Sequence, residues 1–146
     1  MTEQTPDETT AVHNARTVEV FLNALQEQDF DTAGAVLADD LVYQNVGWPT
    51  IHGRSRAMKL FRGMQGRMGF EVKIHRIAAD GAAVLTERTD ALIFGPLRIQ
   101  FWVCGAFEVH DGRITLWRDY FDLLDMVKAT ARASAATVFP SLRRGF

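Results

Sequence analysis

The 146-residue chain carries 16 Lys and Arg against 18 Asp and Glu, and its net charge of -2 offers no broad positive field for nucleic acid or an anionic membrane. Hydrophobic residues at 47% and charged residues at 23% are ordinary for a globular protein, and the length suits one domain with a single core. Cys104 is the only cysteine, which excludes an internal disulfide and a cysteine-based zinc site and fits a reducing cytoplasm.

The first ten residues, 1–10, are polar and acidic, and we expect them to form a disordered tail before a single domain over residues 11–146. They lack the basic start and apolar run of a secretion signal. No apolar run in the chain approaches the roughly 20 residues that a membrane-spanning helix needs. We therefore expect a soluble, cytoplasmic protein without a membrane span.

Two helices begin the predicted domain. Apolar residues at helical spacing predict a helix over residues 11–28 with one buried stripe. Asp29 is placed to cap a second, shorter helix, which we expect to end around the polar pair Asp39-Asp40.

A short strand and a third helix follow. Residues 41–46 read as a strand, and the period of two puts Tyr43 and Asn45 on one face of it. Apolar residues at helical spacing then predict a helix over residues 56–68, with Ser55 as its cap.

The rest of the chain is mostly strand. Residues 70–74, 84–94, 99–109 and 114–121 predict four strands separated by turns, which together make an antiparallel meander. A last helix over residues 123–132 leads into an apolar tail, which we expect to dock on the body or on a second subunit. Helices first and a curved meander afterwards predict an α+β domain.

Charged residues gather on two of these strands. Residues two apart on a strand project from the same face, so Arg88 and Asp90 point together, and Asp119 can join them if its strand lies beside theirs. Two carboxylates would then flank one guanidinium, an arrangement that keeps an acid and a base ready at one pH. Taken alone, an Arg-x-Asp pattern is more often a surface ion pair worth under about 1 kcal/mol.

The strand parities also predict what surrounds this cluster. A curved sheet wrapped by helices encloses a pocket, and apolar residues share the faces that carry the charged cluster. The pocket residues that we expect are Leu92, Phe101, Val103 and Phe121 from the strands, with Met64 and Met68 from the third helix. The two methionines also suit plain core filling. The substrate should be lipophilic, with one reactive polar point.

Three segments together resemble the limonene-1,2-epoxide hydrolase family. They are Tyr43-Gln44-Asn45, Glu87-Arg88-Thr89-Asp90 and the run from Trp117 to Asp122, in this order and spacing. The resemblance spans roughly residues 18–124 and is specific because all three segments occur together. The family belongs to the nuclear transport factor 2-like superfamily, so the resemblance implies a cone-shaped α+β fold, with a curved, mostly antiparallel sheet wrapped by N-terminal helices.

The resemblance also implies a reaction and a role for five residues. Asp119 matches the general base that removes a proton from water, and Tyr43 and Asn45 match the residues that help hold that water. Asp90 matches the general acid that protonates the epoxide oxygen, and Arg88 matches the arginine that bridges the two carboxylates. The implied activity adds water to a small lipophilic epoxide and gives a vicinal diol, without a metal, a cofactor or a covalent intermediate. A homodimer is expected as well.

Two other functions stay open. One is an isomerase or cyclase of the same superfamily, in which a single aspartate moves protons next to a carbonyl group and no arginine is needed between two carboxylates. The other is a non-catalytic module that holds a lipophilic ligand. The four histidines are scattered and lack metal-ligand spacing. The chain also has no phosphate-binding loop, dinucleotide-binding fingerprint or G-x-S-x-G motif that would support another chemistry.

Overall fold

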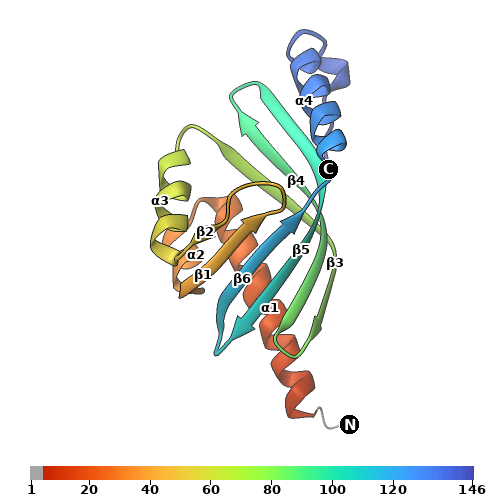
Figure 1. Cartoon of the computed structure of the whole chain (residues 1–146). Coiled ribbons are helices and arrows are strands. Elements are labelled where there is room, and N and C mark those ends of the chain that lie inside the picture. Colours follow the sequence, from red (N-terminus) through yellow and green to blue (C-terminus); the bar gives the residue numbers. More distant parts are fainter. Residues whose placement is uncertain (1–4) are drawn as a thin grey trace.

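Six strands form one curved sheet in the computed structural model, which describes residues 5–146 of the chain (Figure 1). In chain order the strands are β1 (Leu37–Asn45), β2 (Ile51–His52), β3 (Gly69–Asp80), β4 (Ala83–Phe94), β5 (Leu97–His110) and β6 (Arg113–Tyr120). They lie side by side in the order β2-β1-β6-β5-β4-β3. β1 and β6 are parallel, and the other neighbours are antiparallel. The predicted meander is therefore β3 to β6, and β1 extends it at the β6 edge.

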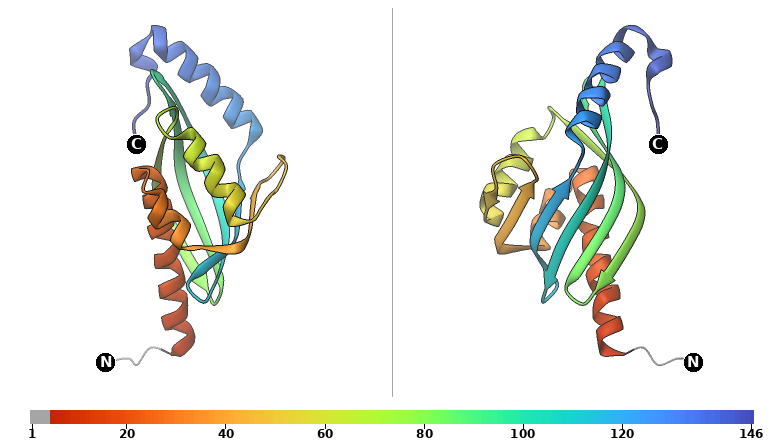
Figure 2. Two further views of the ribbon diagram at one scale, coloured as in Figure 1. Left: turned by 90° about the vertical axis from the view of Figure 1, so that its left-hand side faces the viewer. Right: turned by 45° about the vertical axis from the view of Figure 1, so that its right-hand side comes forward.

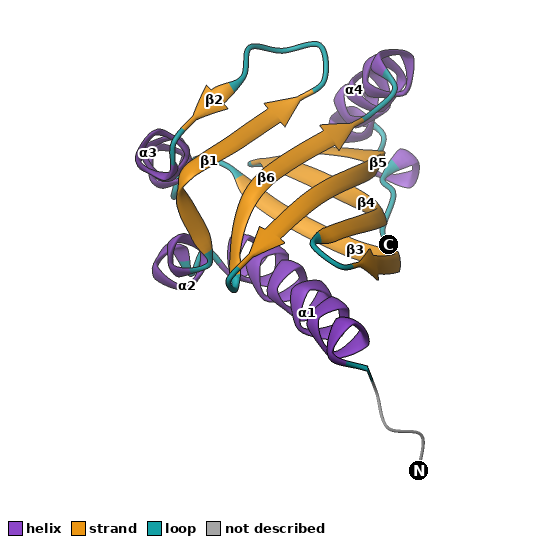
Figure 3. Ribbon diagram, turned by 60° about the horizontal axis from the view of Figure 1, so that its bottom comes forward, coloured by secondary structure: helices purple, strands orange, loops and turns teal. Residues whose placement is uncertain are grey.

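Four α-helices and one short 3-10 helix accompany the sheet. They are α1 (Pro6–Glu27), α2 (Phe30–Ala35), α3 (Arg54–Met64), α4 (Leu123–Val138) and the 3-10 helix η1 (Pro140–Leu142). The two views of Figure 2 show α1 running along the length of the sheet. Figure 3 shows the curvature of the sheet, with α2 and α3 beside β1. This is the expected α+β architecture of a curved sheet wrapped by helices.

The first helix begins earlier than its apolar pattern suggests. Thr5 and Glu8 form a reciprocal capping box, in which each side chain accepts a hydrogen bond from the backbone N–H of the other residue. Pro6 occupies the first helical position, where its missing N–H has no cost. The expected disordered tail is therefore wrong for residues 5–10, while residues 1–4 of that expectation lie outside the described part of the chain.

The next two boundaries also shift. Asp29 caps α2 as predicted, because its side chain accepts from the backbone N–H of Thr32, but α2 ends at Ala35 and not near residues 39–40. Those two aspartates lie exposed within β1, where fully buried Leu37 and Leu41 tie the strand to the core.

The third helix has a different cap from the predicted one. It begins at Arg54, directly after Gly53, and ends at Met64. Gly53 has a φ of 92°, in the region that favours glycine, and its N–H donates to the carbonyl oxygen of Leu41. The predicted cap Ser55 lies inside the helix instead. The helix start is thus set by the chain geometry of the glycine and not by a hydroxyl group.

The main hydrophobic core lies between α1 and the concave face of the sheet. Val18, Phe21 and Leu22 of α1 are fully buried there. They pack against Phe107 of β5 and Trp117 of β6, whose side chains point to the same face of the sheet. The buried stripe that the sequence predicts for the first helix therefore supports the floor of the sheet next to the charged cluster.

A second, smaller core lies under α4. Ala129 and Ala133 of this helix pack against Phe101 and Val103 of β5, which belong to the same face as the main core. The buried small residues continue to Ala136, so the helix runs beyond its predicted end. A cavity lies between the two cores and is lined by residues of both, such as Phe61 and Trp117 of the first and Phe101 and Val103 of the second.

The apolar end of the chain contacts the body of the protein. The Arg98 guanidinium lies 5.0 Å from the ring centroid of Phe146, and the Gln100 side chain donates to the carbonyl oxygen of Gly145. Docking of the tail on the body, one of the two expected arrangements, is what the structure shows. Across residues 5–146 no helix is both long enough and apolar enough to span a membrane.

Candidate active site

Arg88 is the centre of a buried charged cluster. Its side chain is 0% exposed, and it forms a bidentate pair with Asp90, with Nε 2.9 Å from Oδ1 and Nη2 3.1 Å from Oδ2. The same Nη2 donates to Oδ2 of Asp119 at 2.6 Å. Asp90 is 4% exposed and Asp119 is 5% exposed. One guanidinium therefore binds two carboxylates away from water, as the spacing of the three residues suggests.

The cluster spans three strands and not two. Arg88 and Asp90 lie on β4 and Asp119 lies on β6, with β5 between them, as the predicted meander implies. The condition that the strand of Asp119 lies directly beside theirs is not met, yet Asp119 still joins the cluster across β5. Gly105 of β5 makes the reach possible. It pairs with Thr86 of β4 on one side and with Asp119 of β6 on the other. Because glycine has no side chain, nothing on β5 blocks the guanidinium at this position.

The space above Gly105 is already filled by the cluster. A Cβ atom placed there would overlap Nη1 of Arg88, and it would lie only 2.7 Å from Oγ1 of Thr86 and 2.9 Å from the Phe107 ring. Thr86 is itself buried, and its hydroxyl oxygen accepts a hydrogen bond from Nη1 of Arg88 at 3.2 Å. Gly105 and Thr86 are therefore parts of the site that the sequence pattern did not reveal, because neither residue type suggests chemistry.

Burial and charge pairing compete for the protons of the cluster. Burial raises the pKa of Asp90 to about 6, although the charge and hydrogen bonds of Arg88 oppose the rise. Burial also raises the pKa of Asp119, against the opposing effects of Arg88 and of a hydrogen bond from Trp117. Burial alone would lower the pKa of Arg88, but Asp119 and Asp90 together raise it, so the guanidinium stays charged. One cation thus faces two carboxyl groups that both resist ionisation.

Tyr43 and Asn45 place two further polar groups beside Asp119. Both belong to β1, and the parallel pairing puts Asn45 opposite Asp119. The Asn45 side-chain NH₂ donates to the hydroxyl oxygen of Tyr43 at 2.9 Å. This leaves the Tyr43 O–H free to donate and the Asn45 amide oxygen free to accept. Burial, followed by the charge of Asp119, raises the pKa of Tyr43 to about 12, so its hydroxyl stays protonated.

Trp117 completes the surroundings of Asp119. Its indole N–H donates to Oδ1 of Asp119 at 2.8 Å, while Arg88 occupies Oδ2. The indole ring stacks on Tyr43, with ring centroids 4.1 Å apart and planes 23° apart. Trp117 and Asp119 are two residues apart on β6, so the strand period puts them on one face, but no pattern in the sequence indicates the hydrogen bond between them.

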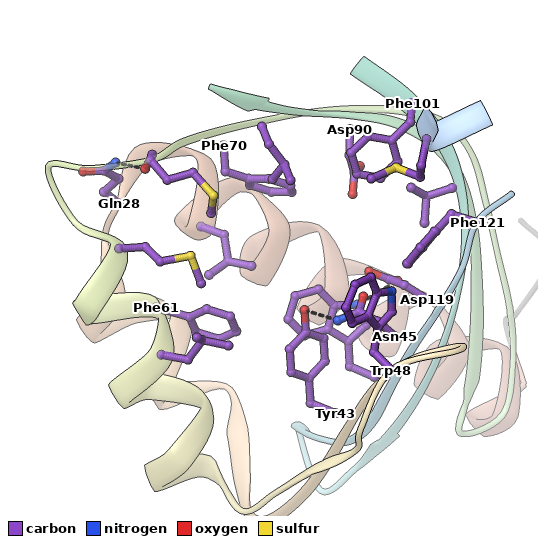
Figure 4. Close-up of a pocket in the computed structure, with 18 of the residues that line it drawn as sticks. Gln28, Tyr43, Asn45, Trp48, Phe61, Phe70, Asp90, Phe101, Asp119 and Phe121 are labelled. Carbon is purple, nitrogen blue, oxygen red and sulfur yellow. Dashed lines mark hydrogen bonds between the residues drawn. The ribbon is translucent and has the colours of Figure 1, made fainter. Parts of the chain in front are cut away.

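An apolar cavity of about 410 Å³ opens onto this cluster. All six predicted pocket residues line it, together with Asp90, Asp119, Tyr43 and Asn45. Figure 4 shows Asp90 and Asp119 near each other on the cavity wall, with Asn45 and Tyr43 beyond Asp119. Trp117, on the same face of β6 as Asp119, lines it as well. Further lining residues that the strand parities did not predict come mainly from helices and loops: Leu25, Gln28, Phe30, Trp48, Leu60, Phe61, Phe70, Leu123 and Met126.

The remaining reactive residue types lie apart from this site. Within residues 5–146 no three His, Cys, Asp or Glu side chains are grouped so that they could hold a metal ion. Cys104 is half-buried on β5. In the same described range, every buried side-chain nitrogen and oxygen has a hydrogen-bond partner. The cluster of two carboxylates, one guanidinium, one phenol and one amide is therefore the chemistry that the cavity offers.

Comparison with known proteins gives a consistent match. Residues 12–132 match the model of the limonene-1,2-epoxide hydrolase catalytic domain. Epoxide hydrolase EphG of Mycobacterium tuberculosis (strain ATCC 25618 / H37Rv) is 65% identical over 143 residues, covering 98% of this chain and 96% of that protein.

Solved structures agree on the fold. A structure of a limonene epoxide hydrolase-like epoxide hydrolase from M. tuberculosis superposes with a TM-score of 0.93 at 64% identity, covering 98% of this chain and 100% of that one. A nuclear transport factor 2-like protein from Burkholderia xenovorans LB400 has a TM-score of 0.66 at 22% identity, covering 82% of this chain and 97% of that one. At that identity the second likeness shows the fold alone.

Gly105→Ala should destabilise the protein through the charged cluster. The added methyl group forces the guanidinium off Asp119 and leaves a buried carboxylate without its partner, which costs about 3–5 kcal/mol of unfolding free energy. Urea denaturation measures the loss. Gly63→Ala is the matched control, because a Cβ atom at Gly63 of α3 meets nothing within 4 Å.

A double-mutant cycle identifies the cause of the Gly105→Ala effect. In an Arg88→Ala background the guanidinium is absent, so Gly105→Ala should cost clearly less than it does in the wild type. Equal costs in the two backgrounds would mean that the methyl group acts on the sheet itself and not on Arg88.

Proposed function

The chain belongs to the limonene-1,2-epoxide hydrolase family, and we propose that this epoxide hydrolase adds water to a lipophilic epoxide in one step of general acid and base catalysis. The observation that carries the mechanism is the buried Arg88, which binds Asp90 and Asp119 at the wall of an apolar cavity. The product would be a vicinal diol. Neither a resident metal nor a covalent ester with the protein is needed in this scheme.

The base side of the reaction consists of Asp119, Tyr43 and Asn45. A water molecule between them would donate one hydrogen to the Asp119 carboxylate and the other to the Asn45 amide oxygen, and it would accept the Tyr43 O–H. The existing hydrogen bond from Asn45 to Tyr43 supports this, because it leaves these donor and acceptor positions free. As the water oxygen attacks an epoxide carbon, Asp119 takes its proton.

The acid side of the reaction is Asp90. The ring C–O bond breaks as the new C–O bond forms, and the leaving oxygen would be a strongly basic alkoxide unless it is protonated. Asp90 lines the cavity beside Asp119, on the side away from Asn45 and Tyr43, so it can deliver a proton to that oxygen while the water attacks from the side of Asn45 and Tyr43 (Figure 4). The turnover leaves Asp119 protonated and Asp90 ionised, and one proton transfer between them restores the starting state.

Arg88 supports both halves of this scheme. Its single positive charge balances one carboxylate but not two, so a water-poor site with both carboxyl groups retains one proton. Asp119 is the better anion, because Arg88, Trp117 and the bound water all donate to it. Asp90 then holds the proton. Burial raises the pKa of both carboxyl groups, so this assignment rests on the donors around Asp119. The guanidinium also fixes the two carboxyl groups relative to each other, because its hydrogen bonds connect Asp90 of β4 with Asp119 of β6.

The cavity favours a substrate that is mostly apolar. Its volume of about 410 Å³ suits a small ring system or a short branched chain. Its lining is mostly apolar, and its polar positions include Asp90, Asp119, Tyr43, Asn45 and Gln28. Such a molecule gains from leaving water, and its epoxide is then the one group that finds polar partners. This is the lipophilic epoxide that the sequence suggests.

The two alternative functions explain less of the site. An isomerase or cyclase with one working aspartate would not need a second carboxylate bound to the same arginine. A non-catalytic ligand module would bury three charged side chains, at a desolvation cost of several kcal/mol per ion, next to a cavity that apolar residues would fill better. The homodimer and the cytoplasmic location expected from the sequence stay predictions, and the molecular mass in solution would test the first.

Asp119→Asn should abolish epoxide hydrolysis while the protein stays folded, because an amide cannot accept the proton of the attacking water. The assay follows conversion of a lipophilic epoxide, such as a cyclic monoterpene epoxide, to its diol by purified protein without added cofactor. Asp40→Asn, a change at an exposed position of β1, is the matched control and should keep full activity. Turnover that survives in Asp119→Asn would remove this residue from the role of base.

The oxygen in the diol distinguishes direct attack from an ester route. Direct attack places the solvent oxygen in the product in the first turnover, whereas an aspartyl ester would deliver a carboxylate oxygen. With enzyme in excess over epoxide in water enriched in oxygen-18, mass spectrometry should find one labelled oxygen in every diol. Unlabelled diol from that first turnover would demonstrate a covalent intermediate.

The pH profile of kcat/KM should be bell-shaped, with Asp90 responsible for the alkaline limb. The acid must be protonated, so the rate falls as pH rises through the pKa of Asp90, which burial raises to about 6. The base must be ionised, so the rate also falls as pH drops through the pKa of Asp119. Because the two carboxyl groups interact, the limbs describe the pair. Asp90→Asn should lose most activity together with the alkaline limb, and a variant with wild-type rate and limb would show that another group supplies the proton.

A further inference from the structure

We propose that Trp117 is a positioning residue of the reaction, which aligns the base and the water-holding tyrosine through a single side chain. Its indole N–H fixes the carboxylate of Asp119, and its ring face fixes the phenol of Tyr43. The inference rests on the proposed hydrolysis, since it assigns Trp117 a role in the same site. Trp117 itself takes up no proton and forms no bond to the substrate.

The first observation is the way in which Asp119 is held. Trp117 and Asp119 lie two residues apart on β6, so both side chains project into the concave side of the sheet. The indole N–H donates to Oδ1 at 2.8 Å, and Arg88 of β4 donates to Oδ2 at 2.6 Å across β5. With one donor on each oxygen, the carboxylate plane cannot rotate. The lone pairs that remain free are then held toward Tyr43 and Asn45, where the water would bind.

The second observation is the way in which the indole itself is held. It stacks on Tyr43 on one side and on Phe107 on the other, with ring centroids 4.1 Å and 6.2 Å away. The edge of Phe21 from α1 meets it at 4.9 Å with planes 83° apart, and Phe61 from α3 lies at 5.9 Å. Rings from β1, β5, α1 and α3 therefore surround Trp117, which is only 4% exposed. A side chain fixed from four elements can in turn fix the two groups that it contacts.

The third observation concerns charge. The groups that face Asp119 are Arg88 and Asp90 from β4 and Tyr43 and Asn45 from β1, while β5 contributes only Gly105. Arg88 is shared with Asp90, so its charge does not act on Asp119 alone. The indole N–H is a donor without an acceptor or a titratable proton, and it favours the ionised form of Asp119 at every working pH. Trp117 is thus the uncharged donor that biases the pair toward an ionised base.

The experiment separates the N–H from the shape of the ring. Trp117→3-benzothienylalanine replaces the N–H by sulfur while keeping the bicyclic ring, and Trp117→Phe is the genetically simple second variant. A hydrogen bond to a charged group favours its ionised form by about tenfold or more, so both variants should move the acid limb of the kcat/KM profile upward by about one pH unit. In the isostere, kcat should fall about tenfold, with KM within about threefold of the wild type.

A readout without substrate keeps the two proposals apart. Carbon-13 NMR of the Asp119 carboxyl carbon follows the titration of this group in the free protein. The midpoint of the titration should rise by about one pH unit in both variants, as the acid limb does. Trp102→Phe is the matched control, because Trp102 is 48% exposed on the other face of β5, and its profile should match the wild type.

The outcomes are distinct. If the isostere keeps the wild-type acid limb and midpoint, Trp117 is only packing and the inference is overturned, while epoxide hydrolysis by the wild type is unaffected. If the midpoint rises but the wild type converts no epoxide, the positioning of Asp119 stands and the proposed reaction fails.

Discussion

The site depends on one buried guanidinium that is shared by two carboxyl groups. A single charge taken out of water costs several kcal/mol, and a carboxylate without a partner costs a similar amount. Arg88 is fully buried, and its contacts with Asp90, Asp119 and Thr86 use all three of its nitrogens. The positions of the two carboxyl groups are therefore not adjustable separately. If one carboxyl group moved, Arg88 would lose a partner in a region that water does not reach. The contact between Arg88 and the second carboxyl group would then change as well.

This constraint explains why the sheet looks as it does around the cluster. The guanidinium of Arg88 must cross β5 to reach Asp119 on β6, and a side chain at position 105 would block it. β5 therefore has a glycine at the position that pairs with Thr86 on one side and with Asp119 on the other. Glycine weakens a strand interior, since it gives no side chain to pack and loses more freedom on folding. The loss is offset by the ion pairs that pass over it. A residue with no functional group is thereby as much part of the site as the charged ones.

Much of this site could be predicted from the sequence, and the part that could not has a definite physical reason. The period of two on a strand is strict, so the common face of Arg88 and Asp90 and the lining positions Phe101 and Val103 follow directly. Strand order is a property of the whole chain. The meander that the turns predict does place a strand between Arg88 and Asp119, but no pattern in the sequence indicates that the guanidinium crosses that strand, so the need for Gly105 stayed hidden.

The same difference between local and long-range information applies to the helices. Asp29 was identified as a cap because its hydrogen bond is local, and the capping box of Thr5 and Glu8 is equally local but lies in a segment whose polar composition suggested a tail. Lining residues from loops and helix ends, such as Trp48 and Leu123, have no periodic signal that relates them to the sheet.

The fold and the chemistry are fixed by different sets of residues. Apolar side chains on α1 and on the concave face determine the cone, and proteins as distant as 22% identity share that shape. The proposed reaction depends instead on polar groups from β1, β4 and β6, whose register the sheet holds. A single exchange among them, such as the loss of one carboxylate from the arginine, would leave the cone intact and remove the paired acid and base. Membership of the superfamily therefore says little about activity, whereas two carboxylates bound to one buried arginine beside an apolar cavity are the feature on which the proposed acid and base chemistry rests.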